Sequence, residues 1–255
     1  MSILPQDTKP TGVRVIQLLP NLLTILAICA GLTAIRFGYQ GEFQTAVQLI
    51  LVAGVLDGLD GRLARSLNCP TPFGAELDSL ADFANFGVAP VLILNAWAFP
   101  DYDSIGWIAV LSYAVCCVLR LARFNVTSRL VPTDKEKQFF VGVPAPAGAF
   151  LVMLPMFVSF LFPEMPSIHP LVVAGYIFAV GLLMISRIPT FSFKSVYVSR
   201  KHTHLLLLGA VLTAVGLMTY PWAAMILITV AYLCSLIWGA YKARKRARRD
   251  GSRPS

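Results

Sequence analysis

The sequence consists largely of apolar segments long enough to cross a lipid bilayer as helices. A span needs about 20 apolar residues, and a helix is favoured because it satisfies its backbone hydrogen bonds internally. Eight segments meet or approach this length: 18–38, 43–66, 73–98, 104–126, 142–162, 169–187, 203–219 and 221–241. Charged residues make up 13% of the chain, against about 25% in soluble domains. We therefore expect an all-α polytopic membrane bundle of about eight transmembrane helices.

The distribution of basic residues predicts how these spans are oriented. If both termini are cytoplasmic and eight spans alternate, every Lys and Arg except Arg36 falls on the cytoplasmic side. Positive charge concentrates on that side of inner membranes. We therefore expect a multi-pass protein of the cell inner (cytoplasmic) membrane, with a cytoplasmic N-terminal segment (1–17) and a basic cytoplasmic tail (242–255).

The basic tail carries most of the net charge of +8. Because it directly follows an apolar segment, the charge does not indicate a nucleic-acid partner. We expect the tail to contact anionic lipid headgroups. The alternative is that it only sets the topology.

Four aspartates interrupt the second and third apolar segments: Asp57, Asp60, Asp78 and Asp82. A carboxylate inside a bilayer costs a few kcal/mol or more, so such residues indicate a functional site. Each pair lies on one helix face. With about 1.5 Å of rise per residue from the turn at 68–72, the two pairs reach matching depths of about 10 and 15 Å. Four converging carboxylates require a cation, most simply a divalent metal.

The neighbours of the aspartates favour phosphate chemistry. Small residues at 58, 61, 64 and 74 allow close approach of a helix or ligand. Arg65 can bind a phosphate, and two metal ions can clamp a diphosphate. We expect this site on the cytoplasmic side of the membrane, open to water-soluble substrates. The alternatives are a metal-ion transporter that uses the acids as a relay, and a non-catalytic lipid-binding scaffold.

The spacing of these residues resembles a known family signature. The stretch 57–82 fits D-x2-D-G-x2-A-R-x8-G-x3-D-x3-D at every position. This is the signature of the CDP-alcohol phosphotransferases, which transfer a substituted phosphoryl group from a CDP-linked donor to an alcohol and release CMP. The chain resembles that family over residues 18–195, which are therefore expected to form a six-helix catalytic core in the membrane. The following segment, 196–241, adds two further helices without an identifying motif.

The resemblance implies a role for each matching residue. Asp57, Asp60 and Asp78 are expected to bind divalent metal, Mg²⁺ or Mn²⁺, as two ions on the diphosphate. Asp82 is expected to join this metal site and to act as the general base. The resemblance also implies a homodimer. The residues expected to border the CDP-linked lipid are Asn21, Thr24, Gly61, Ala64, Arg65 and Gly74.

Three further stretches resemble the membrane-embedded phosphatidylserine synthases within this family. They are 82–90 (DFANFGVAP), 119–125 (LRLARFN) and 139–147 (FFVGVPAPA). The first departs from the usual pattern, because Asn85 stands where these synthases usually have Ser. The resemblance implies CDP-diacylglycerol and L-serine as substrates, and phosphatidylserine and CMP as products.

A serine site needs a cation for the carboxylate of the substrate. Arg120 and Arg123 share a helix face, and arginine binds carboxylates in a bidentate manner. Asn125 can orient the amino group, and Lys194 is a further candidate. Alternatively, these cations bind a phosphorylated acceptor such as glycerol 3-phosphate or inositol phosphate. They can also serve as anchors that extend to the membrane interface.

Overall fold

The structure is a computed structural model, which describes residues 18–67, 71–129, 140–166, 168–186, 189–190 and 203–250. The predicted N-terminal segment 1–17, the last five residues (251–255) of the predicted tail and the candidate Lys194 lie outside these residues. Helices dominate the described chain. The only other regular structure in it is a two-residue antiparallel pairing, β1 (Phe140–Val141) with β2 (Pro189–Thr190).

Helices occupy all eight predicted segments. The first four segments are α1 (Leu19–Tyr39), α2 (Phe43–Ser66), the continuous run α3 (Pro72–Asp82), η2 (Phe83–Val88) and α4 (Ala89–Ala98), and α5 (Asp103–Arg129). The last four are α6 (Ala145–Val152) with α7 (Leu154–Leu161), α8 (Pro170–Ile185), α9 (Thr203–Thr219) and α10 (Pro221–Asp250). Proline occupies the first or second position of α1, α3, α6 and α8, where its missing N–H costs nothing.

Four helical segments are long and apolar enough to cross a membrane, judged by length and composition. They are Leu19–Tyr39, Pro72–Ala98, Ser104–Thr127 and Pro221–Gly239, and α8 is a shorter apolar helix. The membrane-helical class predicted from the sequence is therefore confirmed. The count of eight spans stays a prediction.

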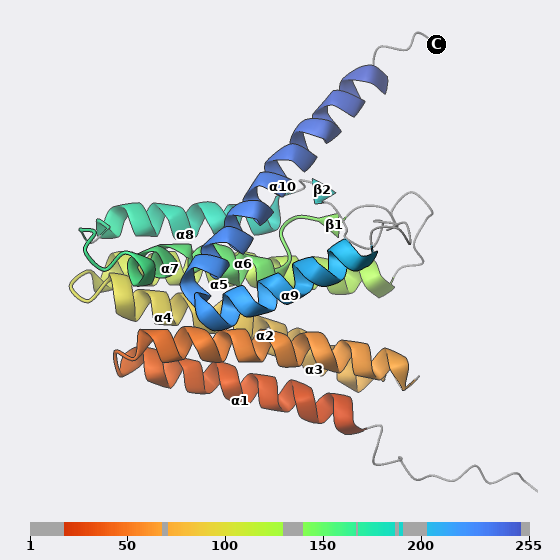
Figure 1. The fold of residues 1–255 in the computed structure, drawn as a ribbon, viewed down its shortest axis with the longest axis horizontal. Helices are drawn as coiled ribbons and strands as arrows, with labels where there is room; N and C mark the ends of the chain where they lie inside the picture. The colour runs from red at the N-terminus through yellow and green to blue at the C-terminus, as the bar shows by residue number, and fades with distance from the viewer. Residues whose placement is uncertain are drawn as a thin grey trace, which may run out of the picture.

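Helices α1 to α8 run side by side along one direction, whereas α9 and α10 cross the bundle (Figure 1). Helix α1 packs along α2 and α4, and α5 packs along α8. Helix α10 contacts α6, α7 and α9 and then extends away from the bundle towards the C-terminus. The predicted basic tail therefore begins as a continuation of this helix.

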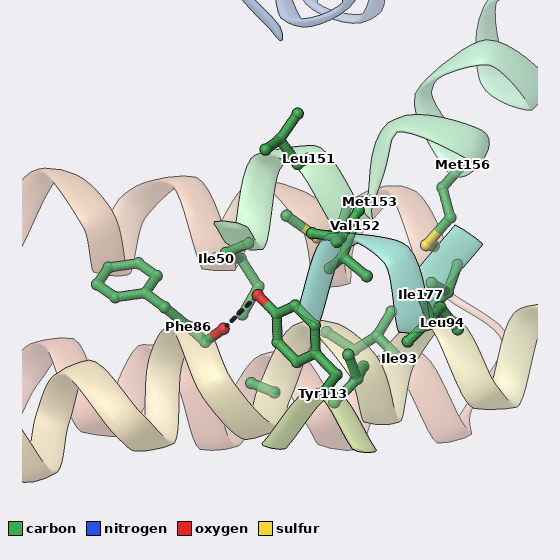
Figure 2. Packing of buried hydrophobic residues seen from close by; sticks show 14 of the residues in the cluster. Ile50, Phe86, Ile93, Leu94, Tyr113, Leu151, Val152, Met153, Met156 and Ile177 are labelled. Carbon is green, nitrogen blue, oxygen red and sulfur yellow. Dashed lines mark hydrogen bonds between the residues drawn. The ribbon is translucent and has the colours of Figure 1, made fainter. Parts of the chain in front are cut away.

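The core lies between α2, α4, α5, α6, α7 and α8, and Figure 2 shows its centre. The largest aromatic side chains buried there are those of Phe86, Phe99, Tyr113 and Phe157. Many large apolar side chains lie instead on the outer faces of the bundle, for example Leu22 on α1 and Ile108 on α5. Such faces suit contact with lipid.

Candidate active site

Three of the four aspartates converge from two antiparallel helices. Asp57 and Asp60 lie near the end of α2, and Asp78 lies on α3, which follows after a short connection. One carboxylate oxygen from each lies within 4.8 Å of the others. These three residues therefore converge, as the matching depths calculated from helix rise predict.

The three carboxylates form a set of ligands suited to a divalent cation. Asp60 is 3% exposed, and Thr24 of α1 donates a hydrogen bond to its Oδ2. The other oxygen of Asp60 and the Oδ1 atom of Asp57 are buried without a hydrogen-bond donor in the described part of the chain. Carboxylate oxygens that lack donors need a cation, and an all-oxygen set is typical of Mg²⁺ and Mn²⁺. These residues therefore fit the metal that the sequence predicts.

Asp82 lies one helical turn beyond Asp78, at the end of α3. It does not belong to the group of three oxygens within 4.8 Å. It interacts electrostatically with Asp57, Asp60 and Asp78, and also with Arg120 of α5. Asp82 therefore interacts electrostatically both with the three-carboxylate group and with a cation on α5.

A cavity of about 170 Å³ opens beside the carboxylates, between α1, α2 and α3. Asp60 and Asp78 line it. All six residues expected to border the CDP-linked lipid also line it: Asn21, Thr24, Gly61, Ala64, Arg65 and Gly74. The structure thus gathers these six residues, which lie up to 53 positions apart in the chain (Asn21 to Gly74), around one opening.

The start of α3 suits this cavity to a phosphate. The Thr71 Oγ1 atom caps the helix by accepting a hydrogen bond from the Gly74 N–H at 3.0 Å. A Cβ at residue 74 would lie 2.9 Å from Asn21 Oδ1 on α1, so a larger residue there would displace the Asn21 side chain. Helix N-termini attract anions, and Arg65 adds a full positive charge to the same opening.

The residues predicted to bind serine have different surroundings. Asn125 donates through Nδ2 to Ser79 Oγ at 3.1 Å, and Ser79 lies between Asp78 and Asp82 on α3. Arg123 donates through Nη1 to the Ile185 carbonyl at 3.0 Å, where α8 ends. Arg120 has a buried Nε atom without a hydrogen-bond partner among the described residues.

Sequence reasoning missed two tyrosines near Arg120. Tyr232 of α10 interacts electrostatically with Arg120, and its buried hydroxyl has no hydrogen-bond partner in the described chain. Tyr113 of α5 is fully buried and donates to the Phe86 carbonyl at 3.1 Å. The sequence contains a signal for the second contact. Pro90 has no N–H, so the carbonyl four residues earlier needs another donor.

A second cavity, of about 500 Å³, lies at the opposite end of the bundle. The connections that follow α4 and α7 line it, and Asp101 is the only charged residue among its described lining residues. It therefore lacks the carboxylate group and the arginine that distinguish the smaller cavity.

Comparison with known proteins agrees with the site. The sequence model of the family described as CDP-alcohol phosphatidyltransferase matches residues 17–186. A second model, described as CDP-alcohol phosphatidyltransferase 2, matches residues 204–236. This second match falls on α9 and α10, in which we recognised no motif.

Several curated relatives are similar over most of the chain, and each carries the name CDP-diacylglycerol–serine O-phosphatidyltransferase. The Mycobacterium tuberculosis H37Rv protein is 38% identical over 231 residues, which cover 89% of this chain and 80% of the relative. The Helicobacter pylori J99 protein is 35% identical over 71% of this chain and 75% of its own. The Bacillus subtilis 168 protein is 35% identical over 69% and 91%, respectively. With its carboxylate group, its cavity and these matches, the chain belongs to the CDP-alcohol phosphatidyltransferase family.

Proposed function

We propose that this protein transfers a phosphatidyl group from CDP-diacylglycerol to the hydroxyl of L-serine, which yields phosphatidylserine and CMP. One observation carries the proposal: the carboxylates of Asp57, Asp60 and Asp78 meet at a cavity lined by Arg65 and the start of α3. A diphosphate needs this combination of metal ligands and positive charge. The names of the relatives support serine as the acceptor.

The proposed reaction begins with the CDP head of the lipid in the cavity. Arg65 and the N-terminus of α3 bind its phosphates. Bound Mg²⁺ or Mn²⁺, which we propose as two ions held by Asp57, Asp60, Asp78 and Asp82, would supply positive charge against the diphosphate and the departing CMP.

Asp82 acts as the general base in this proposal. It accepts the hydroxyl proton of serine, and the serine oxygen attacks the phosphorus on the lipid side. The bond between this phosphorus and the bridging oxygen breaks, and CMP leaves with that oxygen. Much of the rate enhancement then comes from holding the two substrates in position.

Arg120 is the cation that we assign to the carboxylate of serine. Two observations support this role: Arg120 interacts electrostatically with Asp82, and its buried Nε has no hydrogen-bond partner among the described residues. Asn125 lies beside α3 through Ser79 and can orient the amino group. The bond from Arg123 to Ile185 favours a structural role at the end of α8.

The arrangement of the helices supports a cytoplasmic site. The end of α2 and the start of α3 lie on the same side of the bundle as the start of α1, the end of α5 and the C-terminal end of α10 (Figure 1). We propose eight spans in the inner membrane, both termini in the cytoplasm and a catalytic core at 18–195. The homodimer and the contact between the tail and anionic lipids are part of the same proposal.

The reaction is tested with purified protein, CDP-diacylglycerol and Mg²⁺ or Mn²⁺. Serine, glycerol 3-phosphate and inositol phosphate are supplied separately, and CMP release is measured. Of the three acceptors, we expect only serine to give CMP release, together with phosphatidylserine. CMP release with a phosphorylated acceptor and none with serine would contradict serine as the acceptor. It would still support transfer of a phosphatidyl group from CDP-diacylglycerol.

Replacement of Arg120 by Lys tests the carboxylate contact. Lysine keeps the charge but loses the bidentate geometry, so we expect the KM for serine to rise about tenfold or more, as one lost charge-assisted hydrogen bond implies. The KM for CDP-diacylglycerol should stay near the wild-type value. Arg36→Lys, at the far end of α1, is the matched control. An unchanged KM for serine in Arg120→Lys would remove this residue from the site.

A further inference from the structure

The helix that carries Asp78 and Asp82 contains a π-helical turn, η2 (Phe83–Val88), directly after Asp82. The Ala89 N–H bonds to the Ala84 carbonyl five residues earlier, which is the π-helical pattern. Such a turn holds one extra residue. The extra residue rotates the preceding helix face by about 100° relative to an uninterrupted α-helix.

Proline at position 90 accounts for the π-helical turn. In a regular α-helix the carbonyl of residue 86 accepts from the N–H of residue 90. Pro90 has no N–H, and its ring would collide with that carbonyl. Widening the helix before Pro90 relieves the collision and leaves the Phe86 carbonyl in need of a donor.

Tyr113 supplies this donor from a neighbouring helix. Its hydroxyl donates to the Phe86 carbonyl at 3.1 Å, and both residues are fully buried (Figure 2). The two helices approach closely here, since a Cβ at Gly87 would lie 2.9 Å from Cys117 Sγ on α5. A buried carbonyl without a donor is destabilising, so the tyrosine stabilises this turn.

The direction of the aspartates depends on the turn because α4 is buried more deeply in the core than α3. Helix α4 buries Ala89, Pro90, Val91, Ile93 and Leu94 in the core. Helix α3 buries only Ala81. If the π turn became α-helical, the rotation would therefore fall on α3 and move Asp78 and Asp82 away from α2.

We propose that Tyr113 and Pro90 are positioning residues: together they hold the π turn that directs Asp78 and Asp82 towards the carboxylates of α2. Neither residue touches the substrates in this proposal, and both act through the aspartates. The expected effect on kcat rests on the proposed function, whereas the expected effect on the orientation of Asp78 does not.

The first test is Tyr113→Phe, which removes one hydroxyl and keeps the ring. We expect kcat to fall about tenfold to a hundredfold, as misplacement of a catalytic group does, with the KM of both substrates nearly unchanged. Tyr176→Phe is the matched control. The Tyr176 hydroxyl also donates to a backbone carbonyl of another helix, that of Leu151 at 2.6 Å, on helices without the aspartates. Its kcat should stay near the wild-type value, and both variants should show a similar loss in thermal midpoint.

The second test is Pro90→Ala, alone and combined with Tyr113→Phe. Alanine restores the N–H and permits a regular helix. We expect Pro90→Ala to keep its thermal midpoint, to lose kcat and to bind Mn²⁺ more weakly, as measured by electron paramagnetic resonance without substrate. In the double variant the Phe86 carbonyl regains a donor, so stability should recover over Tyr113→Phe while kcat stays low.

Two results would overturn the proposal. One is a Tyr113→Phe enzyme with the same kcat as Tyr176→Phe. The other is a Pro90→Ala protein with wild-type kcat and wild-type Mn²⁺ affinity, which decides the matter even if Tyr113→Phe does not fold. Absence of CMP release by the wild-type protein would contradict the proposed function alone, because Mn²⁺ affinity still reports the orientation of Asp78.

Discussion

Asp82→Asn is expected to lower kcat by about 10³-fold, within the range that a general base contributes. The amide has nearly the shape of the carboxylate but cannot accept the proton of the serine hydroxyl. The cavity of about 170 Å³ is lined by Asp60 and Asp78 and not by Asp82. Binding of CDP-diacylglycerol should therefore remain close to the wild-type level, as measured by equilibrium binding of the labelled lipid.

Glu76→Gln is the control for Asp82→Asn. It makes the same acid-to-amide change on the same helix, at an exposed residue outside the cavity. Its kcat should remain near that of the wild type. Wild-type turnover in Asp82→Asn would remove Asp82 as the base and move that role to another group.

Removal of divalent metal is the second change with a large expected effect. Without a cation, the carboxylates of Asp57, Asp60 and Asp78 repel one another and the diphosphate. Several kcal/mol of charge stabilisation are then lost, which corresponds to about a hundredfold to a thousandfold in rate. We expect chelation to abolish CMP release, and Mg²⁺ or Mn²⁺ to restore it.

Asp78→Asn separates metal binding from other effects of the chelator. It removes one ligand of the three-carboxylate group, so half-maximal activity should require a higher Mn²⁺ concentration, and Mn²⁺ binding without substrate should weaken in parallel. Glu76→Gln again serves as the control. Unchanged CMP release after complete chelation would exclude a metal-dependent reaction.

Local geometry explains why the convergence of three carboxylates could be predicted from the sequence. Asp57, Asp60 and Asp78 lie on two helices joined by a short turn, so helix rise alone fixes their relative depth. Asp82 lies one turn further along and outside the group of three. Its electrostatic interaction with Arg120 depends on where α5 packs, and no local sequence pattern specifies the packing of α5.

The surroundings of the arginines could not be predicted for the same reason. Arg120 and Arg123 carry the same charge and lie on the same face of one helix. Only tertiary packing distinguishes them. Arg123 reaches the end of α8, 62 residues away in the chain, whereas Arg120 interacts electrostatically with Asp82. The π turn follows from Pro90, but its bond to Tyr113 again requires knowledge of how two helices meet.

Helix α1 has two faces with different neighbours. Asn21 and Thr24 line the cavity, whereas Leu22, Ile25 and Leu26 of the same helix are exposed on the outside of the bundle. In the proposed reaction the polar head would lie on the inner side of α1 and the acyl chains would remain in the bilayer beyond it. The donor would then arrive and the product leave by lateral diffusion, without extraction of a lipid from its leaflet, and the length of the fatty acids would matter to the membrane more than to the enzyme.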